Sequence, residues 1–161
     1  KLVHRTVKTL AIVMILIGFA AAFGYIMTLM QIPQQITNLF TSVSTDKYVV
    51  LLMINILLLV LGTLMDMAPL ILIMTPILLP VVMKLGIDPV HFGMIMMVNL
   101  GMGLITPPVG GVLFVGAAVA KLPIERVIKA LYPFFGALLL VLIAVTYIPA
   151  LSLWLPNLLL K

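Results

Sequence analysis

One carboxylate in this sequence lies inside a long apolar region, where an ion needs a partner. Asp66 is the only acidic residue within such a run. An ionised carboxylate is costly in hydrocarbon, so acids at such positions pair with another group or mark an ion pathway. We predict that Asp66 binds a cation. Two simpler roles stay open, namely a helix cap and an acid that reaches water through a vestibule.

Two segments rich in glycine, threonine and proline interrupt the apolar runs. They are GTLMDMAP, Gly62 to Pro69, and GMGLITPPVGG, Gly101 to Gly111. Proline removes a backbone donor and restricts the residue before it, so a helix should unwind around Thr106, Pro107 and Pro108. Carbonyls freed there suit a hard cation such as sodium, whereas the amides of helix N-termini suit a carboxylate. The two segments predict a coupled site, and the alternative at the second is a kink made for packing alone.

The candidate cation ligands are Gly62, Thr63, Asp66, Gly103 and Thr106. Asn99 precedes the second segment, and its neutral amide can donate to an anionic ligand or bond to a neighbouring helix. Both roles stay open. His91 is predicted to be solvated near a helix start, and a proton relay is the alternative role. The 12 methionines are interpreted as flexible packing residues.

The composition identifies the solvent around these residues. Of 161 residues, 65% are hydrophobic and 8% are charged, against roughly 25% charged in a soluble domain. A water-soluble fold is therefore excluded, and we predict an all-α integral membrane protein in a lipid bilayer. The net charge is +5, but the bases lie in short gaps between apolar runs, which indicates topology signals and no nucleic-acid surface. The absence of cysteine excludes thiol chemistry and disulfides.

The apolar runs predict one membrane region over 1–161 without a domain boundary. Its elements are a spanning helix at 8–30, an interfacial amphipathic arm helix at 31–45, a re-entrant hairpin at 47–84, a broken helix at 89–121, a spanning helix at 123–148 and a tail at 149–161. The connection inside the hairpin carries one acid and no base, unlike a short cytoplasmic loop, so it is placed at membrane depth. Two complete spans remain the alternative there, and a plain polar loop is the alternative for the arm.

Helix boundaries are marked by local signals. Thr45 and Asp46 offer caps for the first arm of the hairpin, and Asp88 with Pro89 marks the start of the broken helix. Pro133, after Tyr132, is expected to bend the last span. Two basic clusters are predicted to be cytoplasmic and three single lysines to lie on the opposite side. The clusters are Lys1, Arg5, Lys8 and Lys121, Arg126, Lys129; the single lysines are Lys47, Lys84 and Lys161.

Catalysis is the rival class of function. An intramembrane aspartyl protease needs two facing carboxylates, and the apolar runs offer only Asp66. The serines, Ser42, Ser44 and Ser152, fall outside the predicted spans. The protein is therefore predicted not to be an enzyme. A passive channel is also disfavoured, because half-helix ends without a ring of charge indicate a binding pocket.

The segment from Gly62 to Val115 contains PILLP, GIDPV and GLITPPVG in this order. It resembles the large membrane subunit of the tripartite ATP-independent periplasmic (TRAP) transporters, and the flanking spans also fit. The resemblance implies half of an elevator-type transporter, namely the second of two inverted repeats, in the C-terminal part of a longer subunit of the bacterial inner membrane. The first residue, Lys1, also leads us to expect a piece of a longer chain.

The same resemblance implies a function and partners. The candidate cation ligands would hold one sodium ion, and Thr106 and Pro107 would face the substrate. A small membrane subunit and a periplasmic substrate-binding protein are expected, and the substrate would be an organic acid such as a four-carbon dicarboxylate or a sialic acid. The alternative is a sodium-coupled carboxylate symporter of related architecture that works without a binding protein. With the first repeat absent, the chain alone is not expected to transport.

Overall fold

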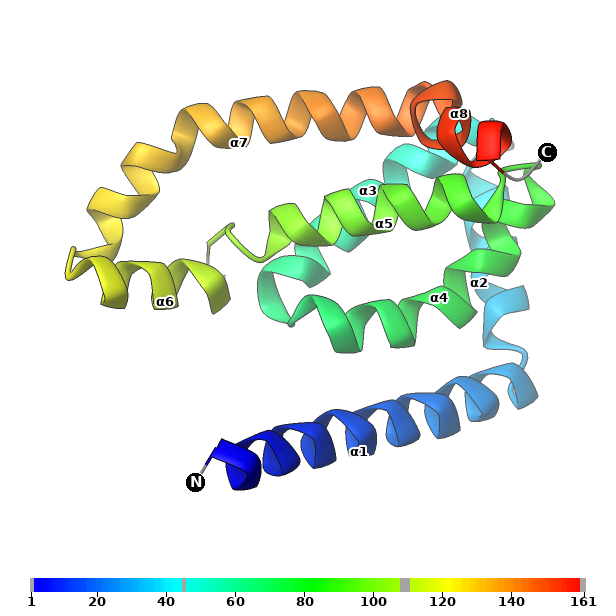
Figure 1. The fold of residues 1–161 in the computed structure, drawn as a ribbon. Coiled ribbons are helices and arrows are strands. Elements are labelled where there is room, and N and C mark those ends of the chain that lie inside the picture. Colours follow the sequence, from blue (N-terminus) through cyan, green and yellow to red (C-terminus); the bar gives the residue numbers. More distant parts are fainter. Residues whose placement is uncertain (1, 45, 108–110, 160–161) are drawn as a thin grey trace.

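A computed structural model describes residues 2–44, 46–107 and 111–159 of the chain. The helices are α1 (Leu2–Leu29), α2 (Ile32–Val43), α3 (Lys47–Leu64), α4 (Met67–Lys84), α5 (Pro89–Gly103), α6 (Gly111–Ala120), α7 (Ile124–Tyr147) and α8 (Pro149–Leu159). Figure 1 shows α1 along one side, α7 along the other, and α3, α4 and α5 between them. The prediction of an all-helical fold is confirmed for the described residues. Lys1, Thr45, Pro108, Gly110 and Lys161 lie outside them.

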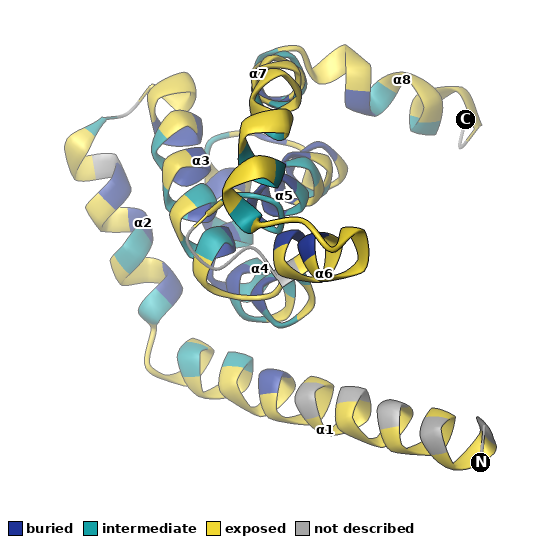
Figure 2. Cartoon of the chain, turned by 90° about the vertical axis from the view of Figure 1, so that its left-hand side faces the viewer, coloured by how far each residue is buried: buried dark blue, intermediate teal, exposed yellow. Residues whose placement is uncertain are grey.

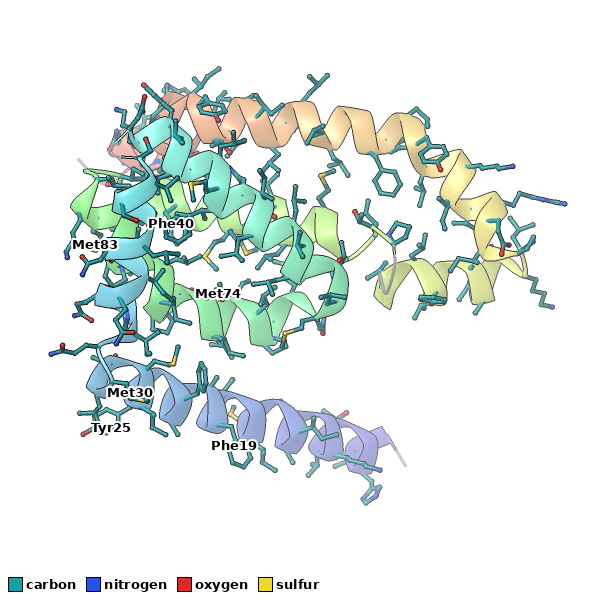
Figure 3. The ribbon with its side chains drawn as sticks, turned by 180° about the vertical axis from the view of Figure 1, so that it is seen from behind. Phe19, Tyr25, Met30, Phe40, Met74 and Met83 are labelled. Atoms are coloured by element: carbon teal, nitrogen blue, oxygen red, sulfur yellow. The ribbon has the colours of Figure 1, made fainter. Side chains whose placement is uncertain are left out.

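Among the described residues, four helices are long and apolar enough to cross a membrane. They are Thr6–Leu29 within α1, and α3, α4 and α7. Only 6% of the α1 and α7 windows is buried, against 33% in α3 and α4, and Figure 2 shows exposed residues dominating the two outer helices. Their apolar surfaces, including Phe19 and Tyr25 (Figure 3), are those of a multi-pass membrane protein, because water does not solvate such surfaces.

The core lies between α3, α4 and α5, with α2 packed on α4. Its buried side chains are Phe40, Val50, Leu51, Ile54, Leu58, Leu70, Met74, Ile77, Leu78, Val81, Val82, Ile87, Phe92, Ile95, Met96 and Leu100. Phe40 of α2 and Met74 of α4 are labelled in Figure 3. α3 buries one stripe at helical spacing, including Val50, Ile54 and Leu58, while apolar residues on its opposite side, Leu52, Ile56 and Val60, are exposed.

The arm region forms α2 as a helix rather than a polar loop. Its apolar residues are divided between the protein core and the outer surface. Phe40 is 5% exposed and belongs to the core, whereas Leu39 and Val43 are both 64% exposed. α2 is therefore anchored on α4 and leaves apolar side chains free on its outer surface.

The hairpin differs in detail from the sequence prediction. α3 has 18 residues and continues to Leu64, so Gly62 and Thr63 are helical. Only Met65 and Asp66 separate α3 from α4, and Pro69 lies in the first turn of α4, where a missing donor costs nothing. The chain thus reverses over two residues inside the predicted tip, Gly62 to Pro69, and the rest of that segment is helical.

The predicted interruption after Gly103 is confirmed. α5 ends there, Leu104 to Pro107 form turns and a bend, and α6 begins at Gly111. Pro107 follows Thr106 directly, so the loss of helix there has the expected steric cause.

The last part of the chain adds a helix that the sequence analysis did not predict and a bend that it did. The residues predicted as a tail form α8, in which Pro149 occupies the first helical position and Ser152 is buried. α8 packs on α5 and α7. α7 continues through Pro133 as one helix and changes direction within its N-terminal part (Figure 1), as expected of a proline bend.

Candidate functional site

α3 and α5 run side by side in the same direction. Asn55 contacts Asn99 near the middle of the pair, and Gly62 contacts Gly103 further along both helices. The N-termini of α3 and α5 meet at Lys47 and Asp88, which line one cavity. The C-terminus of the first hairpin arm and the C-terminus of the first half of the broken helix therefore lie together.

The contact between Gly62 and Gly103 is made by backbone atoms. A Cβ on Gly103 would lie 2.7 Å from the carbonyl carbon of Gly62 and 2.9 Å from its oxygen. Real Cβ atoms do not approach backbone that closely, so only glycine fits at Gly103. The hairpin and the break, which the sequence marked as two separate segments, are thus joined at two of the predicted ligand positions.

This junction is electrostatically suited to a cation. The last carbonyls of a helix lack intrahelical partners, and each helix C-terminus carries about half a negative charge. At the end of α5, the carbonyl of Gly103 accepts one bond, from Thr106 N (3.0 Å), and a carbonyl oxygen has a second lone pair. Two such ends meet here, so a bound cation would neutralise both.

Two threonine hydroxyls flank the junction, and both donate to a backbone carbonyl of the preceding helical turn. Thr63 Oγ1 donates to the carbonyl of Val60 (2.8 Å), and Thr106 Oγ1 donates to the carbonyl of Met102 (2.7 Å). Each hydroxyl donates its only hydrogen within its own segment, so the oxygen can act towards other groups only as an acceptor. Thr63 and Thr106 are half-buried, so their oxygens have the chemistry of sodium ligands.

Asp66 takes up one of the roles that the sequence left open. Its backbone is extended, and its Oδ1 accepts from the amide of Met67 (2.9 Å), which makes it the N-cap of α4. The side chain is exposed. Capping uses one carboxylate oxygen, so Oδ2 is not consumed by the cap.

Asn99 is engaged in packing. It is fully buried (0% exposed) and its Nδ2 donates to the backbone oxygen (3.0 Å) and to Oδ1 (2.7 Å) of Asn55. Both donor hydrogens are spent inside the protein, so none is left for an anionic ligand. The only unpaired atom of this amide in the described structure is Oδ1, an acceptor.

Sequence reasoning missed two members of this polar contact. Asn55 Nδ2 donates to Thr146 Oγ1 of α7 (3.0 Å), and both residues are buried. The available signal was a single amide in the apolar run LLMINILLL, because a buried polar group in a membrane helix needs a partner.

Pro107, the predicted substrate-facing neighbour of Thr106, is exposed.

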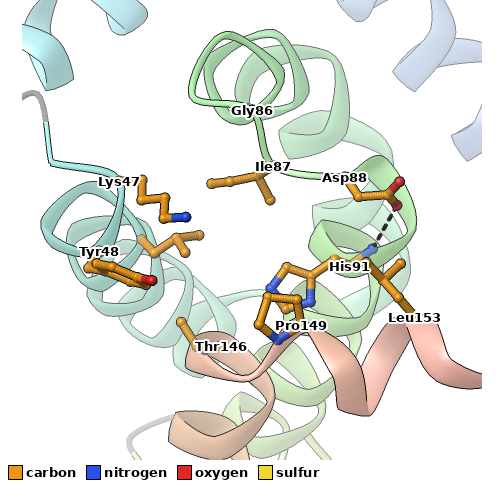
Figure 4. A pocket seen from close by; sticks show the side chains of 10 residues that line it. Lys47, Tyr48, Gly86, Ile87, Asp88, His91, Thr146, Pro149 and Leu153 are labelled. Atoms are coloured by element: carbon orange, nitrogen blue, oxygen red, sulfur yellow. Dashed lines mark hydrogen bonds between the residues drawn. The ribbon is translucent and has the colours of Figure 1, made fainter.

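A second place, at the N-terminal ends of α3 and α5, contains none of the predicted site residues. A cavity of about 140 Å³ is lined there by Lys47, Tyr48, Leu51, Gly86, Ile87, Asp88, His91, Thr146, Pro149 and Leu153 (Figure 4). The predicted cap is confirmed, since Asp88 Oδ1 accepts from the amides of Val90 and His91. The prediction of a solvated His91 is wrong. His91 is 3% exposed and its Nδ1 lies 3.1 Å from Ser152 Oγ, because α8 covers it.

Comparison with known proteins identifies relatives. The family described as "Tripartite ATP-independent periplasmic transporter, DctM component" matches residues 1–151. An isethionate TRAP transporter permease protein DctMQ of Oleidesulfovibrio alaskensis is 48% identical over 91% of this chain and 23% of its own length. A C4-dicarboxylate TRAP transporter large permease protein DctM of Pseudomonas aeruginosa is 45% identical over 98% of this chain and 37% of its own.

A sialic acid TRAP transporter large permease protein SiaM of Vibrio cholerae is 38% identical over 98% of this chain and 37% of its own length. The chain thus spans between 23% and 37% of the length of these curated relatives. Their names give three different organic anions.

Proposed function

Because this chain belongs to the DctM family of TRAP transporters, we propose that it forms part of the large permease subunit of a sodium-coupled importer of an organic acid. The observation that carries the proposal is the backbone contact between Gly62 and Gly103. It brings two helix C-termini together, and these are the backbone groups that favour a cation in membrane transporters.

In this proposal the cation is held where α3 and α5 end. The ligands are drawn from the carbonyls at Gly62 and Gly103, the hydroxyl oxygens of Thr63 and Thr106, and the free oxygen of Asp66. The chemistry of this set supports sodium, since hard cations take oxygen ligands. Sodium supplies positive charge that stabilises the two helix ends together.

The substrate contact is assigned to Thr106 and Pro107. They follow the end of α5 directly, and Pro107 is exposed, so a ligand can reach them. Asn99 is left out of this contact, because it is fully buried and both of its donors are spent on Asn55. A cation that fixes the end of α5 also fixes the residues that meet the substrate, which supports coupling of the two.

The transport mechanism and the partners are part of the same proposal. The hairpin α3–α4 would be re-entrant, and the chain would be the second repeat of an elevator-type subunit in the bacterial inner membrane. The subunit would work with a small membrane subunit and a periplasmic binding protein that delivers the acid. The names of the relatives support isethionate, a C4-dicarboxylate or a sialic acid as substrate classes. No enzymatic activity is proposed.

The test is uptake by the full-length subunit, with its partners, reconstituted in proteoliposomes. We expect uptake of one of a panel of carboxylates and sulfonates only when an inward sodium gradient is imposed. Replacement of both Asp66 and Thr106 by alanine should weaken the sodium response, and an unchanged response in this variant would refute the site. Omission of the binding protein separates the two transporter classes: retained uptake would favour the symporter that needs none.

A further inference from the structure

Three buried polar side chains connect three helices next to the candidate site. Asn55 of α3 is 7% exposed, Asn99 of α5 is 0% exposed and Thr146 of α7 is 2% exposed. Asn99 donates to Asn55, and Asn55 donates to Thr146. The two links join residues 44 and 91 positions apart in the sequence, so they hold tertiary packing and not local structure.

Asn55 is the central residue of this chain of hydrogen bonds. Its backbone carbonyl can only accept, so the nitrogen of the Asn99 amide must face it, and the Asn99 orientation is thereby fixed. Its own side chain accepts from Asn99 through Oδ1 and donates to Thr146 through Nδ2. Removal of Asn55 Oδ1 and Nδ2 would leave Asn99 with only the backbone carbonyl of Asn55 as acceptor and would free Thr146 of α7.

The hydrogen bonds between Asn55 and Asn99 and the contact between Gly62 and Gly103 lie on the same interface of α3 with α5. Asn55 precedes Gly62 by seven residues on α3, and Asn99 precedes Gly103 by four on α5, spacings that place each pair on one face of its helix. One fixed point would let α5 rotate about it or tilt. Two fixed points set the rotation and the axial position of α5 against α3, and hence where the carbonyls at the two helix ends point.

We propose that Asn55 is a positioning residue of the cation site. It rests on the proposed function, and it assigns to Asn55 an effect on sodium affinity without contact to sodium or substrate. Through Asn99, Asn55 holds the end of α5 in register with the end of α3; through Thr146, it ties this pair to α7. Loss of the Asn55 side chain lets the ends of α3 and α5 move relative to each other, so the ligand oxygens no longer meet at one point.

The chain offers a matched control. His91 Nδ1 and Ser152 Oγ form another buried polar link, which joins the same helix α5 to α8 at 3.1 Å. It lies at the N-terminal end of α5, opposite to Gly103. Ser152→Ala therefore removes a bond of comparable kind from α5 without altering the register at the site.

The experiment measures the sodium concentration for half-maximal uptake, the KM for substrate at saturating sodium and the melting temperature of the complete transporter. The variants are Asn55→Ala, Asn99→Ala, both together, Thr146→Val and Ser152→Ala. Asn55→Ala should raise the sodium half-saturation about three- to twentyfold, with little change in the KM at saturating sodium. The free-energy effect of the double variant should be smaller than the sum of the effects of Asn55→Ala and Asn99→Ala, since the two residues share the bond from Asn99 Nδ2 to Asn55 Oδ1.

Ser152→Ala should lower the melting temperature but leave the sodium half-saturation unchanged. An equal sodium shift in Ser152→Ala, or none in Asn55→Ala, would overturn the proposal. If Asn55→Ala does not assemble, Thr146→Val decides: it keeps the Asn99 contact but frees Asn55 from α7, and a smaller shift in the same direction is expected. No shift in that variant overturns the positioning role. Wild-type uptake that ignores sodium refutes the proposed function itself, whereas a sodium-driven wild type with normal Asn55→Ala refutes only this inference.

Discussion

Gly103 at the end of α5 contacts the backbone of Gly62 in α3, and the contact is asymmetric. A Cβ on Gly103 would lie 2.8 Å from Gly62 Cα, whereas a Cβ on Gly62 would lie 3.4 Å from Gly103 Cα and from Leu100 Cδ2. The first distance requires backbone to move, while the second is a tight contact that a small displacement relieves. The two glycines are therefore not equivalent.

Gly103→Ala is predicted to separate the ends of α3 and α5. Overpacking against backbone should destabilise the protein by about 1–3 kcal/mol and abolish the sodium response of uptake by the full-length complex. Gly62→Ala should have a milder effect. Gly101→Ala is the control, because a Cβ there meets nothing within 4 Å; it should leave both properties unchanged. Melting temperature and sodium half-saturation measure the outcome, and equal behaviour of Gly103→Ala and Gly101→Ala would refute the prediction.

Asp66 combines a structural role with a proposed ligand role, and two substitutions separate them. Asparagine is a good N-cap, so Asp66→Asn keeps the bond to Met67 N and removes the charge. Asp66→Ala removes both and should cost about 1 kcal/mol of stability. We expect a raised sodium half-saturation in both variants and a lowered melting temperature in Asp66→Ala alone. A normal sodium response of Asp66→Asn would reduce Asp66 to a cap.

Thr106 is predicted to act through its hydroxyl oxygen. Thr106→Ser preserves this oxygen and its bond to the Met102 carbonyl, so sodium-driven uptake should be largely retained. Thr106→Val keeps the shape but removes the oxygen, and the sodium half-saturation should rise. Titration of uptake with sodium for both variants is the measurement. Equal responses of the serine and valine variants would show that the hydroxyl is not a ligand.

The helices and their ends were predictable because their causes are local. Apolar runs, the Asp46 and Asp88 caps and the prolines after Thr106 each act within a few residues, and the structure places a helix start or a break at each. The continuation of α3 past Gly62 to Leu64 was not predictable in this way. Glycine costs about 1 kcal/mol in a helix interior, and the compensating contact comes from Gly103, 41 positions away in the sequence.

The site was predicted as two segments, but its assembly depends on tertiary packing. Asn55 was read as part of an apolar run, and its buried bonds exist only because α5 and α7 pack on α3. His91 was assigned to solvent because no local signal predicted α8, the helix that buries it. Pro149 occupies the first position of α8, where a proline is compatible with a helix.

The re-entrant hairpin is the last prediction, and helix length does not decide it. α3 and α4 have 18 residues each, or about 27 Å, close to the hydrocarbon thickness of about 30 Å. The chain contains no cysteine, so single cysteines report on sidedness in a full-length subunit freed of any others. The positions are Met65→Cys at the hairpin tip, Lys84→Cys at its open end and Lys129→Cys in a basic cluster.

Labelling with a membrane-impermeant thiol reagent gives the result. Lys84→Cys should react from the periplasmic side and Lys129→Cys from the cytoplasmic side. Met65→Cys should react from the cytoplasmic side about tenfold more slowly than Lys129→Cys or less, because a re-entrant tip lies at membrane depth within protein. Sodium should slow it further, since the cation is proposed to hold the adjoining end of α3 against α5. Equal cytoplasmic rates at Met65→Cys and Lys129→Cys, with or without sodium, would instead make α3 and α4 two complete spans.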